Sequence, residues 1–252
     1  MILRRVIEHV REQNWTAIAI DFVIVVLGVF VGIQAQEWNN LRAQRRLEHV
    51  YLERVLSDIN LSIDTNELNV ARLTGNSDGS TLVLNSLRSC SLNEAQRDAF
   101  ADGLSDIAKV GPSVFVLNTM DEMLSAGNFS IIRSPKIRDV LNGLARDAKY
   151  QKNIYDVISA QLAAATATTN RRVIWTHQDH KTPFDPVAWS DMEIDFDALC
   201  KDKEYQAAVS NARYLTNAGI SLNQRAIASL KTARSALERE LGISRAHGEA
   251  AP

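Results

Sequence analysis

The chain has 252 residues, with 28 basic and 30 acidic side chains and a formal net charge of -2. This balance argues against a nucleic-acid partner, because such binders gather Lys and Arg against phosphates. Only 5 Pro and 11 Gly are present, a composition that favours long helices over a turn-rich β-sandwich. We therefore predict an all-α fold.

Residues 1–14 have the spacing of an amphipathic helix. Val6 and Val10 fall on one side of it, and Arg4, Arg5 and Arg11 fall on the other. Such a segment is suited to lie flat on the anionic cytoplasmic face of a membrane. We predict an amphipathic cytoplasmic lead-in here.

An apolar segment, WTAIAIDFVIVVLGVFVGI, follows from Trp15 to Ile33. Its 19 residues span roughly 29 Å as a helix, which matches a hydrocarbon core of about 30 Å. We assign residues 15–36 to one transmembrane helix. A cleaved signal peptide is the alternative, but the apolar run is longer than usual for one and Asp21 interrupts it.

Arginine counts on the two sides of this helix do not decide its orientation. Arg4, Arg5 and Arg11 precede the segment, and three more arginines follow it within residues 42–46. We place the N-terminus in the cytoplasm because the α-amino group adds charge there and a large domain is translocated largely regardless of charge. The expectation is a single-pass inner-membrane protein with a periplasmic C-terminal domain.

Small and polar side chains line one stripe of the predicted transmembrane helix. Asp21, Gly28, Gly32 and Gln36 share this stripe, and the two glycines form a G-x-x-x-G pair that permits close helix contact in lipid. A carboxyl group inside a bilayer costs about 2.5 kcal/mol or more unless it is paired, protonated or hydrated. We predict a helix interface and a homo-oligomer; the alternative is a hydrated Asp21 near the headgroups with incidental glycines.

Residues 37–242 are predicted to form a soluble, antiparallel helical bundle, followed by a disordered tail at 243–252. Apolar residues at three- and four-residue spacing predict the helices, and Gly, Pro and capping residues predict their ends. The expected features are a helix ending by Gly75, a turn at 76–79, a short helix to Cys90, a capping box at 91–94, a helix closed by Gly111-Pro112, a helix capped by Asn118 and ending at Gly127, a helix from Ser134-Pro135 toward Arg172, a loop at 177–195 crossing the bundle, and two helices at 203–217 and 220–241.

Three stretches resemble an uncharacterised family of bacterial membrane proteins. They are IVVLGVFVGIQAQEWNN at residues 24–40, LSAGNFSIIRSPKIRDVL at 124–141 and YLTN at 214–217. The resemblance implies a helical, single-pass, inner-membrane protein. It implies no activity and no catalytic residues.

Two cysteines and one histidine-containing loop are the candidate chemical sites. Cys90 and Cys200 would form a disulfide if the domain is periplasmic and would be buried thiols if it is cytoplasmic. His177, Asp179 and His180 match no established metal-site spacing, so we predict a solvated polar loop. We predict no metal, no cofactor and no enzyme activity, since nucleophile elbows and phosphate loops are absent from the sequence.

Three hypotheses of function follow from this pattern. The first is a membrane-anchored interaction or scaffold module that self-associates through its transmembrane helix. The second is an ion-coupled accessory subunit that uses Asp21 together with a multi-span membrane protein, an analogy of layout alone. The third is a periplasmic ligand sensor, for which the sequence shows no convergent polar groups.

Overall fold

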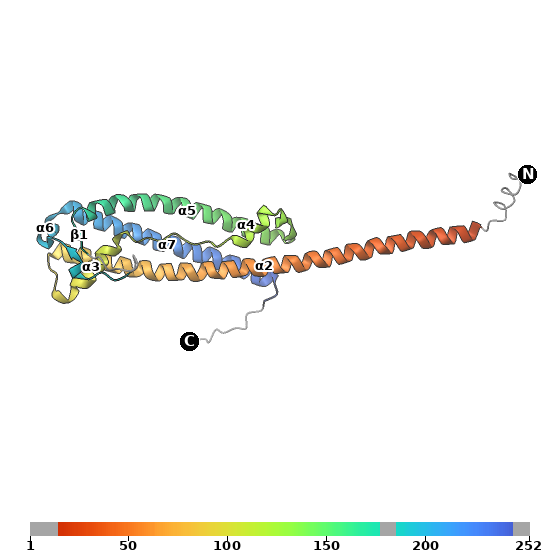
Figure 1. Ribbon diagram of the computed structural model, residues 1–252, viewed down its shortest axis with the longest axis horizontal. Helices are drawn as coiled ribbons and strands as arrows, with labels where there is room; N and C mark the ends of the chain where they lie inside the picture. The colour runs from red at the N-terminus through yellow and green to blue at the C-terminus, as the bar shows by residue number, and fades with distance from the viewer. Residues whose placement is uncertain (1–14, 177–184, 244–252) are drawn as a thin grey trace, which may run out of the picture. The chain divides into compact units, whose positions relative to one another are not determined.

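The computed structural model of the protein describes residues 15–176 and 185–243, without the side chains of residues 15–19, 21 and 108. The all-α prediction is confirmed, since helices account for nearly all regular structure there (Figure 1). The predicted lead-in at 1–14 and the tail from residue 244 lie outside the described residues. The helices and strands are α2 (Trp15–Ser89), α3 (Arg97–Ser105), α4 (Asn118–Ser125), α5 (Pro135–Asn170), β1 (Ile174–Trp175), β2 (Met192–Glu193), α6 (Phe196–Lys201) and α7 (Lys203–Glu240), with 3₁₀ turns at Glu94–Gln96, Asp106–Ala108, Asn128–Ile131 and Trp189–Asp191.

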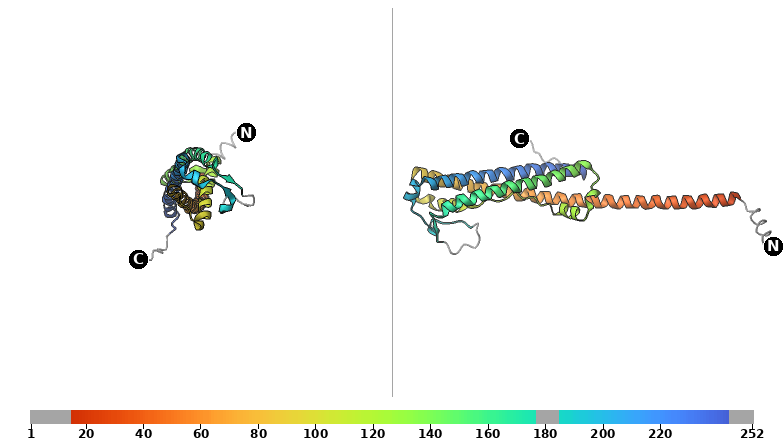
Figure 2. Two further views of the ribbon diagram at one scale, coloured as in Figure 1. Left: turned by 90° about the vertical axis from the view of Figure 1, so that its left-hand side faces the viewer. Right: turned by 90° about the horizontal axis from the view of Figure 1, so that it is seen from above.

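The chain divides into two compact units, one up to Val50 and one from Tyr51 onward. In the second unit the later part of α2 lies beside α5 and α7 as three long helices (Figures 1 and 2). Residues 109–117, which are extended, return along α2 between α3 and α4. Three helices and one extended segment therefore make the up-and-down arrangement that the sequence predicted as helices alone.

The predicted end of α2 at Gly75, with a turn at 76–79, is wrong. The helix continues to Ser89 because the polar residues of this stretch hydrogen-bond elsewhere in the bundle and Gly79 packs against α3. The predicted break between 217 and 220 is also wrong, since α7 runs unbroken from Lys203 to Glu240. Gly219 lies inside it, where a Cβ would stand 3.0 Å from Cγ1 of Val110.

Helix starts and stops agree with the sequence in part. Pro135 begins α5 after Ser134, and Gly127 follows α4 with a φ of 70°, the left-handed conformation expected there. The capping box at 91–94 is wrong, because Asn93 is the residue that caps the following turn. Asn118 is the first residue of α4 and not its cap. The predicted loop at 177–195 contains β2, which pairs antiparallel with β1.

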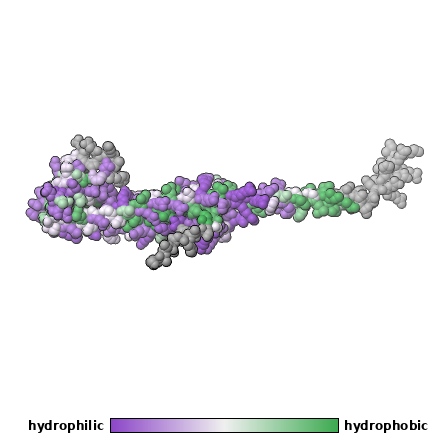
Figure 3. Space-filling model, turned by 90° about the horizontal axis from the view of Figure 1, so that it is seen from below, coloured by the Kyte–Doolittle hydropathy of each residue, from purple (hydrophilic) through white to green (hydrophobic). Residues whose placement is uncertain are grey.

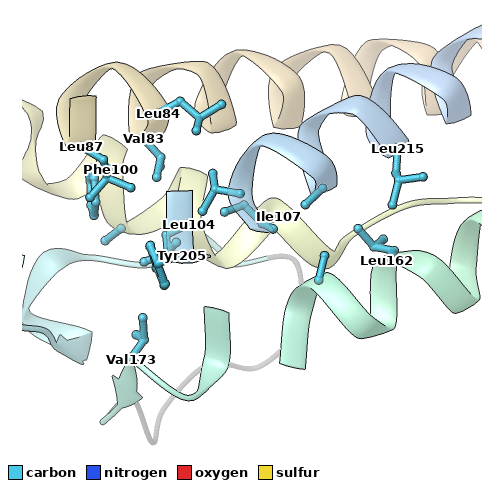
Figure 4. Packing of buried hydrophobic residues seen from close by; sticks show 14 of the residues in the cluster. Val83, Leu84, Leu87, Phe100, Leu104, Ile107, Leu162, Val173, Tyr205 and Leu215 are labelled. Carbon is cyan, nitrogen blue, oxygen red and sulfur yellow. The ribbon is translucent and has the colours of Figure 1, made fainter. Parts of the chain in front are cut away.

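Two separate hydrophobic clusters form the core of the second unit. One contains Phe100, Leu104 and Tyr205, which lie where α2, α3 and α7 come together (Figure 4). The other contains Met120 and Met123 of α4. Along the long helices the nearest buried members of the two clusters are separated by about one to six helical turns. That interval holds buried polar residues.

Candidate functional site

No other part of the described chain covers the apolar segment of α2. Its large side chains from Ile20 to Ile33 are 48% to 69% exposed, and they form a hydrophobic surface (Figure 3). Within the described residues, this is the single helix long and apolar enough to cross a membrane, judged by length and composition. Contiguous apolar surface of this size is rare on water-soluble monomers.

The predicted interface stripe of this helix is open. A Cβ added to Gly28 or Gly32 would meet no atom of the described chain within 4 Å. Gln36 is exposed, and the side chain of Asp21 lies outside the described residues. The two glycines therefore serve no packing contact within the described chain.

Trp38 follows the apolar segment and carries a cation–π contact. The Arg42 guanidinium carbon lies 4.1 Å from the centroid of the Trp38 ring. Tryptophan and arginine at this place are typical of the boundary between lipid and water. The apolar segment thus ends in a pair suited to a membrane surface.

A disulfide joins Cys90 to Cys200. Cys90 stands directly after α2 with a φ of 47°, and Cys200 lies in the short helix α6, with 5.3 Å between the two Cα atoms. The bridge spans a sequence separation of 110 residues. It ties the end of α2 to the entry of α7, and Figure 1 shows both elements at the same end of the bundle.

The extended segment 109–117 is held on α2 by an amide that pairs with its backbone. Asn66 donates from Nδ2 to the carbonyl oxygen of Val114 over 2.7 Å, and its Oδ1 accepts from the Val114 N–H over 3.0 Å. Asn66 is fully buried. One side chain therefore supplies both hydrogen bonds that a neighbouring strand would supply.

Four more polar residues of α2 bind backbone groups, three of them on the extended segment and one at the start of α4. They follow Asn66 or precede it at helical spacing, so they lie on one face of α2. Ser62, Asn69 and Asn76 each satisfy one backbone group that the extended chain cannot satisfy within itself. Asp58 accepts from the Thr119 N–H, one of the free donors in the first turn of α4. The pairs are Asp58 with the Thr119 N–H (2.9 Å), Ser62 with the Val116 N–H (2.8 Å), Asn69 with the Pro112 carbonyl (3.3 Å) and Asn76 with the Lys109 carbonyl (2.9 Å).

A buried amide from each long helix separates the two hydrophobic clusters. Asn66 of α2, Gln151 of α5 and Asn223 of α7 are 0%, 6% and 0% exposed. Asn223 is hydrogen-bonded to the Gly219 carbonyl (2.9 Å), whereas Oε1 of Gln151 has no hydrogen bond in the described structure. Buried polar positions of this kind fix helix register at a cost in stability.

A groove of about 360 Å³ lies between α5 and α7. No sequence pattern predicted this groove, although the polar residues of α7 that line it recur every four positions. Its volume lies within the range of small-molecule sites. The lining residues are Ile154, Ile158, Tyr214, Asn217, Ala218, Ser221, Leu222 and Arg225.

The displaced pKa values have structural causes. The Tyr205 N–H hydrogen bond, aided by Arg172, holds the pKa of the Asp202 carboxyl below its ordinary value. The Arg54 hydrogen bond lowers the pKa of Glu122, and burial raises the pKa of the Tyr205 hydroxyl. These residues cap a helix, form an ion pair and fill the core, so they do not converge as a catalytic set.

No group of three His, Cys, Asp or Glu side chains suited to a metal ion occurs among the described residues. The histidine loop at His177, Asp179 and His180 lies outside them. Comparison of the chain with family models, with curated proteins and with solved structures found no match. The resemblance drawn from the sequence stays a prediction.

Proposed function

We propose that this protein is a single-pass inner-membrane protein whose helical domain lies in the periplasm and acts as an interaction module. Two observations support the proposal. The uncovered apolar segment of α2 is the observation that carries it, since lipid is the environment that removes such a surface from water. The Cys90–Cys200 disulfide is of the kind that persists in oxidising compartments.

Self-association through the membrane helix is part of the proposal. Gly28 and Gly32 give a shallow surface on which a second helix approaches closely, and nothing in the described chain occupies it. The protein uses glycine in this way elsewhere, where Gly79 of α2 meets Gly103 of α3. A second copy presents the same surface, as a two-fold interface requires.

Thiol labelling tests the location of the domain. In intact cells, a membrane-impermeant maleimide should label Cys90 and Cys200 only after reduction. Labelling that needs cell lysis but no reductant would put the domain in the cytoplasm and overturn the proposed topology.

Crosslinking in native membranes tests self-association. Gly28→Leu and Gly32→Leu should each lower the yield of crosslinked dimer several-fold, because a larger side chain separates the helices. Val23→Leu, on the opposite side of the helix, is the matched control and should leave the yield unchanged. Equal yields in all three variants would exclude the glycine interface.

A further inference from the structure

The floor of the α5–α7 groove is apolar and is packed against the hydrophobic core. It consists of Ile154 and Ile158 from α5 with Ala218 and Leu222 from α7. Ile158 and Leu222 are each 6% exposed and belong to a hydrophobic cluster of the core. A ligand on this floor therefore meets a surface that packing already holds in place.

Two rows of side chains run along the α7 side of the groove at four-residue spacing. One row is mainly apolar and the other is polar, so the groove has an apolar side and a side that can form hydrogen bonds. Together the two rows, from Tyr214 to Arg225, extend about 16 Å along the helix at about 1.5 Å per residue. The apolar row is Tyr214, Ala218 and Leu222, and the polar row is Asn217, Ser221 and Arg225.

Among the described residues that line the groove, Arg225 is the one that carries a charge. No hydrogen bond or ion pair of Arg225 is found in the described structure. Two other cations of α7 have partners there: Lys231 pairs with Glu67 over 2.7 Å, and Arg239 donates to the Ser235 carbonyl over 3.0 Å. A guanidinium beside an apolar floor is suited to the anionic end of an amphiphile.

We infer that this groove binds a single-chain anionic amphiphile of the fatty-acid class. Its carboxylate accepts hydrogen bonds from the Arg225 guanidinium, and its alkyl chain covers Leu222, Ala218 and the two isoleucines toward Tyr214. Each buried CH₂ group adds favourable transfer free energy, so a long chain binds better than a short one. A groove of about 360 Å³ accommodates one such chain.

Photocrosslinking of the full-length protein tests this inference. The protein is placed in phosphatidylcholine nanodiscs with a palmitate that carries a diazirine, and the labelled peptides are mapped by mass spectrometry. Label is expected at residues 154–158 and 214–225, and unlabelled palmitate should displace it. Arg225→Gln should lower this labelling about tenfold, as for loss of a charge-assisted hydrogen bond, whereas Arg239→Gln, an exposed arginine of the same helix, should not.

A second variant and a second probe make the test independent of folding defects. Ala218→Trp should block labelling in the groove while the helical circular dichroism signal and the crosslinks of the membrane segment stay unchanged. Equal labelling by an alkylammonium probe of the same length would overturn the role of Arg225. Displacement by phosphatidylglycerol as effective as that by palmitate would overturn the single-chain assignment.

Discussion

Gly79 of α2 and Gly103 of α3 meet backbone to backbone. A Cβ on Gly79 would lie 2.9 Å from the Cα of Gly103, and a Cβ on Gly103 would lie 2.7 Å from the carbonyl oxygen of Gly79. Both distances are shorter than carbon and oxygen atoms tolerate without movement of the chain. The two helices thus cross at a separation that only glycine permits.

Gly79→Ala should destabilise the domain by about 1–3 kcal/mol, because the added methyl group forces the helices apart. Gly75→Ala, one turn earlier in α2, is the matched control. Its Cβ would meet nothing within 4 Å, so it should stabilise the helix by about 0.5–1 kcal/mol. Urea denaturation followed by circular dichroism measures both, and equal effects would refute the close crossing.

Asn66→Asp should lower the free energy of unfolding by about 2–3 kcal/mol. The substitution keeps the shape of the side chain but removes the donor to the Val114 carbonyl and buries a charge. Asn153→Asp on the exposed face of α5 is the control and should change the free energy of unfolding by less than about 0.5 kcal/mol. Native-state hydrogen exchange should also show lower protection across residues 113–117 in the Asn66 variant, because the segment loses a hydrogen bond to α2.

Gln151→Leu should raise the free energy of unfolding, the opposite of the effect expected for Asn66→Asp. Oε1 of Gln151 is buried without a hydrogen bond in the described structure, so an apolar side chain of similar size removes a desolvation cost of about 1 kcal/mol. The expected result is a higher melting temperature. A lower melting temperature would show that a bound water or another partner satisfies this oxygen.

Reduction of the disulfide should destabilise the helical domain. Closure of a loop of this length contributes about 2–4 kcal/mol by restricting the unfolded chain. The melting temperature should fall in reductant, and the Cys90→Ser, Cys200→Ser double variant should match the reduced protein. If that variant melted at the temperature of the oxidised protein, the bridge would have no part in stability.

Acid should weaken the fold as the two carboxyl groups with lowered pKa values become protonated. The folded pKa values of Asp202 and Glu122 lie below their ordinary values of 3.8 and 4.5, so both stabilise the fold above those values. That contribution is lost as the pH falls through the lower, folded values. Melting temperatures measured from pH 7 to pH 3 should begin to drop below about pH 4. The melting temperature of Asp202→Asn, which keeps a capping side chain, should drop less steeply with pH.

Long-range contacts explain where the sequence predictions failed. Apolar spacing predicted the long helices, and the signals at Gly127 and Ser134-Pro135 marked real boundaries, because these patterns act within a few residues. Gly79 and Gly219 were misread as breaks because glycine also serves close packing, which depends on a partner far along the chain. A helical wheel of α2 contains the polar face of Asp58, Ser62 and Asn66, but only the fold shows that it holds an extended segment.

The groove could not be predicted from one helix, since its floor comes from α5 and α7 together. The i, i+4 row of Asn217, Ser221 and Arg225 was visible, but such rows more often face water. The open glycine stripe at Gly28 and Gly32 was read directly from the sequence. It needed no tertiary information because a lone helix presents it.

The Cys90–Cys200 bridge also changes the covalent topology of the domain. Every peptide bond between those two residues lies inside a closed covalent ring, and α3, α4 and α5 are built from that ring. A protease that cuts once inside it opens the ring but releases no fragment, so α2 and α7 stay in one molecule. On a denaturing gel such a nicked protein would keep its full mass until a reductant separated the two pieces.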